Sequence, residues 1–347
     1  MKFGILGPVE VISGGQPLAL GGLVQRAALG YLLLHCNKVV ATSALVRAVW
    51  GHDAPPTARK MVQNAVSRLR RTLAEGDGEG QVELVTCSPG YLLRVDPDAV
   101  DVHRFRTLAE RGRAELSQGR AERAAATLGE ALAQWRGPAL SDLTETGIDW
   151  PQTALLENER LAAFEDSAEA GLALGRHFEI VRELEAMTEA EPARERLCGQ
   201  LMLALYRCHR QREALAAYQR TRMALVETFG LDPGRELQSL EMKILQHDES
   251  LAVPGRPHAA PAPAPVLAPA PAPAPVLAPA PVLAPVPAPA PVAAAAAAVG
   301  PRSRSDLFSS PTGGVSPHAR AAARARGEEL AMAHRWRGAD PLWASLW

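Results

Sequence analysis

Short apolar segments separated by turn residues open the chain and predict a small antiparallel sheet. They read KFGILG, EVIS and QPLAL, and glycine-containing turns lie between them. A helical period follows the third segment. Its apolar positions predict one buried face and an end at Asn37, and they are Leu29, Leu32, Leu33 and Cys36.

A second helix is predicted after a brief extended step at Val39 and Val40. It begins at Thr42 or Ser43, whose hydroxyl groups suit an N-terminal cap, and Gly51 closes it. The residues expected to be buried are Leu45, Val49 and Trp50.

The stretch 57–74 divides clearly into two helical faces, and the prolines at 55 and 56 suit the entry to such a helix. At about 100° per residue, one stripe is apolar and the opposite stripe is polar. The apolar stripe holds Val62, Val66, Leu69 and Leu73. The polar stripe holds Lys60, Asn64, Ser67 and Arg71, with Arg68 beside it.

A glycine-rich loop, EGDGEG, leads from this helix to two strand-like runs, VELVTC and YLLRV. Ser88, Pro89 and Gly90 join the runs and predict a hairpin. The order of elements in the first hundred residues is therefore strands, helix, helix, basic helix and hairpin.

Residues 102–247 carry helical periods and no strand pattern. Helix pairs of roughly 34 residues with small residues at their contacts are similar to tetratricopeptide repeats, which stack to leave a concave surface. One predicted stripe consists of Ala214, Tyr218, Leu225 and Phe229, with Leu201 and Leu205 on the partner helix and a stop at Gly230 and Pro233. Trp135 and Trp150 fit core anchors better than partner contacts, because each lies at a helix boundary.

The remainder, 251–347, has a different composition and holds 19 of the 29 prolines. PVLAP recurs three times between Pro265 and Pro285. Such a tract has too few large apolar groups to offset chain entropy, so disorder is predicted. The alternative is a short basic helix near the end that adds DNA affinity, with Trp336, Trp343 and Trp347 docking on a partner.

Charge is distributed as unevenly as proline. Residues 1–100 hold 10 basic and 8 acidic side chains, residues 101–250 hold 19 and 26, and the rest hold 8 and 4. The stretch 57–74 alone has five basic residues and no acidic one. A formal net charge of -1 therefore conceals a basic helix beside an acidic helical part.

Several function classes lack their motifs. We find no secretory signal and no apolar stretch of about 20 residues, which predicts a cytoplasmic protein. The four cysteines are Cys36, Cys87, Cys198 and Cys208, and they form no CxxC pair. We expect packed thiols rather than a metal site, and neither a cofactor nor an enzyme active site, because no phosphate loop, HExxH or GxSxG occurs.

The basic helix suits double-stranded DNA, because phosphates neutralise its charges while counterions are released. Its amides at Gln63 and Asn64 can pair with adenine, and Arg68 or Arg71 with guanine. The alternative is a merely solvated surface helix. A solvated face usually mixes charges of both signs, and opposite charges four residues apart do not occur on this helix.

Two blocks of sequence resemble the Streptomyces antibiotic regulatory protein (SARP) family. VVATSALVRAVWG, APPTARKMVQNAVSRLRRTL and ELVTCSPGYLLRV resemble its OmpR-type winged helix. WRGPALSDL, LALGRH, ERLCGQLMLALYRCHRQREALAAYQ and FGLDPGRELQSLEMKIL resemble its bacterial transcriptional activator domain. The likeness covers residues 1–250 and departs at Ala65, where the family has an aromatic residue, at Ala41, where it has a serine cap, and at the hairpin turn, which lacks an arginine.

The resemblance implies a mainly α fold with a small β component. Its parts are a winged-helix DNA-binding domain (1–98) and an all-α tetratricopeptide-like activator domain (99–250). The tail predicted to be disordered (251–347) lies outside the resemblance. The third helix would enter the major groove. The DNA-binding residues expected from the pattern and the family are Thr57, Arg59, Lys60, Gln63, Asn64, Ser67, Arg68 and Arg71.

Members of that family bind direct repeats at promoters of biosynthetic genes and recruit RNA polymerase. The resemblance therefore implies a pathway-specific transcriptional activator located in the cytoplasm with the nucleoid. A homodimer on the DNA is a further candidate assembly. The alternative is a helical-repeat adaptor that binds protein and has no specific DNA site.

Overall fold

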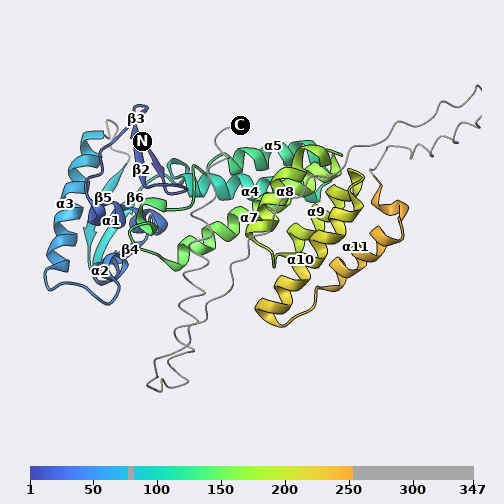
Figure 1. Ribbon diagram of the computed structural model, residues 1–347. Coiled ribbons are helices and arrows are strands. Elements are labelled where there is room, and N and C mark those ends of the chain that lie inside the picture. The colour runs from blue at the N-terminus through green and yellow to red at the C-terminus, as the bar shows by residue number, and fades with distance from the viewer. Residues whose placement is uncertain (77–81, 253–347) are drawn as a thin grey trace, which may run out of the picture. The chain divides into compact units, whose positions relative to one another are not determined.

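The computed structural model describes residues 1–76 and 82–252 (Figure 1). The first part consists of β1 (Lys2–Gly4), β2 (Glu10–Ser13), β3 (Gln16–Pro17), α1 (Leu23–Leu34), β4 (Val39–Ala41), α2 (Thr42–Trp50), α3 (Ala58–Gly76), β5 (Glu83–Cys87) and β6 (Gly90–Arg94). The short helix η1 (Pro97–Ala99) leads to α4 (Asp101–Ser117), α5 (Ala121–Leu132), α6 (Ser141–Thr144), α7 (Pro151–Ala173), α8 (His177–Ala190), α9 (Glu195–Arg207), α10 (Gln211–Phe229), α11 (Arg235–Leu245) and η2 (Glu249–Leu251). Within these ranges every element after β6 is helical, which confirms the predicted mainly α fold.

Two small antiparallel sheets flank the first three helices. The first sheet has the order β1-β2-β3, as the opening apolar segments predict, with Phe3 opposite Val11. The second has the order β4-β6-β5, so the hairpin pairs with the extended step at Val39 and Val40. This pairing places the hairpin beside the start of α2 and beside α3.

The three helices share one hydrophobic core. The apolar stripe of α3 is buried as predicted, and α3 packs on α1 and α2 through it. Leu29, Leu32, Leu33 and Leu45 lie in the same core, whereas Cys36 and Trp50 are only half-buried. The helix α1 ends at Leu34, before the end that the sequence predicts at Asn37. Asn37 itself adopts a left-handed conformation with φ 59°.

The start of α2 corrects the predicted cap. Ala41 occupies the N-cap position with extended backbone, and no side chain accepts a hydrogen bond there. Thr42 is already helical, and its hydroxyl lies 3.4 Å from the carbonyl oxygen of Pro89 instead. The hydroxyl groups of Thr42 and Ser43 lie one and two residues after the N-cap position. The first amide groups of α2 therefore have no side-chain acceptor.

We expect Ala41→Ser to raise the free energy of unfolding by about 0.5 to 1 kcal/mol, because a serine oxygen at the N-cap can accept from an amide of the first turn. Chemical denaturation of both proteins measures this difference. Ser43→Ala is the matched control: Ser43 is exposed and caps nothing, so the change should have little effect. An equal response of the two variants would contradict the assignment of the cap.

The hairpin turn is shorter than predicted. Ser88 and Pro89 form it, and Gly90 is the first residue of β6, paired with Cys87 and Ala41. A side chain at position 90 would collide with the carbonyl oxygen of Val40, so glycine is required by close approach to β4. At the other end of the predicted loop EGDGEG, α3 extends to Gly76, and the rest of that loop lies outside the described residues.

The helices from α4 onward pack as successive neighbours. The main contacts are α4 with α5, α5 with α7, α8 with α9, and α9 with α10, and α11 lies against α9 and α10 (Figure 1). Leu201, Leu205, Ala214, Tyr218 and Leu225 are buried, as the helical periods predict. Trp135 and Trp150 are also buried, which confirms their role as core anchors.

Phe229 contradicts the predicted stripe of α10, since 61% of its surface is exposed. It is the last residue of α10, and Gly230 turns the chain away in a left-handed conformation with φ 69°. Leu225 is the last buried residue of the stripe, and the four residues of α10 that follow it are exposed. The helical stop at Gly230 itself is as predicted.

The hydrophobic core of the first part continues across residue 98. Val100, Phe105, Trp135 and Trp150 belong to the same buried cluster as Phe3, Leu33 and Val66. Polar contacts reinforce the junction: the Leu140 amide donates to the Ile5 carbonyl oxygen at 3.0 Å, and Trp150 Nε1 donates to the Ala48 carbonyl oxygen at 2.9 Å. The division into 1–98 and 99–250 stays a prediction, and the predicted tail from 253 lies outside the described residues.

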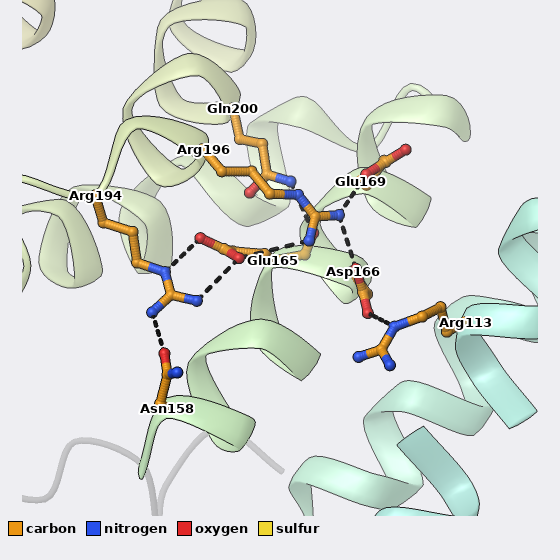
Figure 2. A network of polar contacts seen from close by, with 8 residues as sticks. All are labelled: Arg113, Asn158, Glu165, Asp166, Glu169, Arg194, Arg196 and Gln200. Atoms are coloured by element: carbon orange, nitrogen blue, oxygen red, sulfur yellow. Dashed lines mark hydrogen bonds and ion pairs between the residues drawn. The ribbon is translucent and has the colours of Figure 1, made fainter. Parts of the chain in front are cut away.

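An arginine–carboxylate network joins three helices of the second part (Figure 2). Glu165 and Asp166 of α7 are buried at its centre. Glu165 accepts from Arg194 at 2.6 and 3.2 Å, and Asp166 accepts from Arg113 of α4 at 2.9 Å and Arg196 of α9 at 2.7 Å. Each buried carboxylate is therefore compensated by guanidinium groups from neighbouring helices.

Candidate nucleic-acid interface

The polar face of α3 is exposed along its whole length. We use that name for the eight predicted residues, all of which are exposed: Thr57, Arg59, Lys60, Gln63, Asn64, Ser67, Arg68 and Arg71. Thr57 directly precedes the first helical residue, and the other seven lie within α3. The buried stripe on the opposite side fixes the helix, so the polar face is presented on a rigid element.

Four of the five basic residues of this helix have neither an ion pair nor a hydrogen bond within the described residues. Within residues 1–76 and 82–252, no acidic group forms an ion pair with Arg59, Lys60, Arg68 or Arg71. Elsewhere the chain pairs its exposed arginines readily, as Arg94 with Glu83 at 2.8 Å shows. A phosphate backbone would supply the missing counter-charge.

Arg70, the fifth basic residue, has a structural role. Its Nε donates to the carbonyl oxygen of Leu84 at 2.6 Å, and its Nη2 donates to the Thr86 hydroxyl at 2.5 Å. The guanidinium also lies 6.0 Å from the centre of the Tyr91 ring. Arg70 therefore ties α3 to the β5–β6 hairpin, and the other four basic side chains of the helix remain available.

The side-chain amides of the polar face are available to hydrogen-bond with a ligand. Among the described residues, Gln63 and Asn64 make no side-chain hydrogen bond to protein. An exposed amide that presents a donor and an acceptor side by side can pair bidentately with adenine in a major groove. Asn64 lies between Lys60 and Arg68 on this face, one helical turn from each.

Sequence reasoning missed Met61, which is exposed beside the polar face. The Thr57 hydroxyl donates to its sulfur at 3.7 Å. Its neighbour Ala65, where the family has an aromatic residue, is buried, so that departure affects helix packing rather than the polar face. The helical angle of Met61, about 60° from Asn64, could have placed it beside the polar face from sequence alone. Methionine suits a hydrophobic core equally well, so the residue type did not decide the question.

The hairpin tip adds little charge to the interface. Ser88 and Pro89 are exposed, and neither is basic. The nearest basic side chain of the hairpin, Arg94, is paired with Glu83. The geometry therefore assigns the hairpin a supporting role for α3, through Arg70, more than a contact surface of its own.

The remaining polar candidates form no site of recognisable chemistry. Cys36 Sγ lies 3.1 Å from His103 Nε2, and burial raises the pKa of this thiol and lowers the pKa of the imidazole. Burial likewise raises the pKa of Cys198 to about 11, so these thiols are held protonated. All four cysteines are free, no group of three metal-ligating side chains occurs in the described ranges, and none of the helices there is long and apolar enough to cross a membrane.

Two family models match the chain on either side of the junction. The model described as "Transcriptional regulatory protein, C terminal" matches residues 22–93, and the "Bacterial transcriptional activator domain" matches residues 100–245. The first match contains α1 to α3 and the hairpin, and the second contains α4 to α11. Both describe transcriptional regulators, which confirms the expectation that the chain is not an enzyme.

Three regulators are similar in sequence. The chain is 36% identical to transcriptional regulatory protein EmbR of Mycobacterium tuberculosis over 246 residues, which is 71% of this chain and 63% of EmbR. It is 40% identical to regulatory protein AfsR of Streptomyces griseus over 263 residues, 76% of this chain and 26% of AfsR. It is 35% identical to regulatory protein DnrI of Streptomyces peucetius over 256 residues, 72% of this chain and 94% of DnrI. The matched region thus spans less than two thirds of EmbR and about a quarter of AfsR, but nearly all of DnrI.

A solved structure of Mycobacterium tuberculosis EmbR, in complex with a low-affinity phosphopeptide, has the same fold over the matched region. The TM-score is 0.66 at 36% sequence identity, and the match covers 71% of this chain and 65% of that one.

Proposed function

The chain belongs to the Streptomyces antibiotic regulatory protein family, and on that premise we propose that it is a DNA-binding transcriptional activator of a biosynthetic gene cluster. The observation that carries the proposal is the polar face of α3, where four unpaired cations flank free amides. Such a face is costly for an isolated protein, because its like charges repel one another, and it is stabilised by a ligand that carries phosphates.

The residues of this face divide into two roles. Arg59, Lys60 and Arg71 supply charge to phosphates, and Ser67 offers a hydroxyl donor to the same backbone, while the Thr57 hydroxyl at the start of the face donates to Met61. Gln63, Asn64 and Arg68 reach base edges, where an amide recognises adenine and a guanidinium recognises guanine. The face would lie in the major groove, while Arg70 holds the hairpin in place behind it.

The helical part from residue 99 to 250 would hold RNA polymerase at the promoter. Its acidic balance favours a basic partner surface and disfavours a second DNA-binding face. Direct repeats in the promoter would bring two copies of the chain side by side on the DNA. A protein with these partners acts in the cytoplasm, with the nucleoid.

The second candidate function is a helical-repeat adaptor whose winged helix binds protein. A salt series separates the two functions, because a DNA binder loses affinity with a log-log slope of about -0.9 for each phosphate contacted. Footprinting of the full chain on promoters near its own gene tests the proposal directly. Protection of a repeated sequence is expected, whereas equal affinity for every duplex at low salt would overturn the proposal.

Two substitutions on the polar face should weaken DNA binding in different ways. Arg71→Ala should reduce affinity for all sequences alike and make the salt slope shallower by about 0.9, because one phosphate contact is lost. Asn64→Ala should leave the slope unchanged and relax the preference at one base pair, at a cost of about 1 to 3 kcal/mol.

Titrations of matched and mismatched duplexes at several salt concentrations measure both effects. Arg182→Ala is the control, since Arg182 is an exposed arginine of α8 and lies outside the polar face. A uniform loss for the Asn64 variant would show that Asn64 contacts the backbone rather than a base.

A further inference from the structure

Met61 is an apolar exception on the exposed side of α3. The other large hydrophobic side chains of this helix, Val62, Val66, Leu69 and Leu73, are buried, whereas 38% of the surface of Met61 is exposed. It does not belong to the hydrophobic core cluster that α3 shares with α1 and α2. Core packing therefore does not account for a methionine at this position.

Helix geometry places Met61 among the residues proposed to reach the bases. At about 100° per residue, Met61 lies about 20° from Arg68, two turns later, and about 60° from Asn64, one turn later. A helix that inserts Asn64 and Arg68 into a groove must bring Met61 to the same depth on one flank. Its side chain would then lose contact with water when the helix binds.

A hydrogen bond restrains the Met61 side chain before any ligand arrives. The Thr57 hydroxyl, one turn earlier, donates to the Met61 sulfur at 3.7 Å. A free methionine loses substantial rotamer entropy when it is fixed. The contact with Thr57 directs the sulfur along the helix and lowers this entropic cost of binding.

We propose that Met61 is a specificity-determining residue that contacts the 5-methyl group of a thymine in the major groove. The thymine methyl group is the apolar feature of the major-groove edges, and apolar side chains recognise it. The eight residues of the polar face are polar or charged, and among them only Thr57 carries a methyl group, so Met61 is the large apolar side chain on this flank that matches it. The inference rests on the proposed function, since it requires α3 to lie in the major groove.

Replacement of thymine by deoxyuridine tests the contact, because it removes one methyl group and preserves base pairing. In the footprinted duplex, each thymine would be exchanged in turn and the affinity of the full chain measured. One position should show a loss of about fourfold, the effect of leaving one methyl group unburied. In Met61→Ala, affinity for the thymine duplex should fall by a similar factor, and the deoxyuridine penalty at that position should disappear.

The matched control is Met223→Ala, which removes an exposed methionine (56%, against 38% for Met61) from α10 and should leave both affinity and the deoxyuridine penalty unchanged. Met61→Leu should retain the penalty, because leucine keeps an apolar contact. Retention of the penalty in Met61→Ala, or the absence of a penalty at every thymine, would overturn this inference and leave the proposed function intact. Failure of the proposed function is distinguishable, since the parent protein would then show no preferred duplex to modify.

Discussion

Asp101→Ala is expected to lower the free energy of unfolding by about 3 to 5 kcal/mol, the largest effect we predict for one substitution. The Asp101 carboxylate is only 4% exposed. It accepts from the Ile5 amide at 2.9 and 3.0 Å, from the Leu6 amide at 3.0 Å and from Arg136 Nη2 at 3.2 Å. Its removal leaves two buried backbone donors without an acceptor, each at a cost of about 1 to 3 kcal/mol. It also removes one of the two carboxylates that pair with Arg136, which keeps Glu10.

The effect should extend to both parts of the chain. Asp101 is the first residue of α4, and its partners are the segment after β1 and the residue that follows Trp135. Arg136 also donates from its backbone amide to the Leu6 carbonyl oxygen at 2.8 Å and pairs with Glu10 at 3.0 Å. Loss of the carboxylate therefore weakens the contact between the winged helix and the helices beyond residue 98.

Urea denaturation followed by circular dichroism and by tryptophan fluorescence measures the prediction. Trp135 and Trp150 lie in the cluster at the junction, so their emission should change together with helix content if the cluster unfolds as one unit. Asp98→Ala is the matched control, because Asp98 lies three residues earlier, is exposed, and its side chain forms no hydrogen bond or ion pair with the described residues. A destabilisation of Asp101→Ala below about 1 kcal/mol would show that the carboxylate is dispensable.

The sequence predicts α3 well because the determinants of that helix are local. The apolar stripe and the polar face follow from a fixed angle per residue and need no knowledge of other elements. The role of Arg70 could not be deduced in this way. The helical angle places Arg71 and not Arg70 on the polar stripe, but that Arg70 is bound follows only from the position of the β5–β6 hairpin.

The contacts between the winged helix and the helices beyond residue 98 could not be predicted from sequence either. Asp101 and its partner amides are separated by more than 90 residues, and an aspartate at a helix start is ordinarily read as a solvated helix terminus. The same limit explains Phe229: helical period predicts the face on which a residue lies, but the exposed end of α10 depends on where its neighbours stop.

The second large effect is expected for Glu165→Ala, which should lower the free energy of unfolding by about 2 to 3 kcal/mol. The Glu165 side chain is 4% exposed and accepts two hydrogen bonds from Arg194. Charged hydrogen bonds of this kind contribute about 1.5 to 3 kcal/mol. The loss should stay below that of Asp101→Ala, because Arg194 is one quarter exposed, can be hydrated and keeps its bond to Asn158.

Glu169→Ala is the control within the same network (Figure 2). Glu169 pairs with Arg196 at 2.6 Å, but 54% of its side chain is exposed, and surface pairs of this kind contribute at most about 1 kcal/mol. Denaturation curves of the two variants should therefore separate by at least about 1 kcal/mol, although each removes one carboxylate bound to arginine. Similar losses of unfolding free energy in Glu165→Ala and Glu169→Ala would mean that water screens the buried ion pairs of the network as strongly as the exposed ones. Because the apolar neighbours of Glu165 on α7, Phe164 and Ala168, belong to a different hydrophobic cluster from the stripe of α3, the folded variant should bind DNA with the affinity and salt slope of the parent, which assigns this network to stability alone.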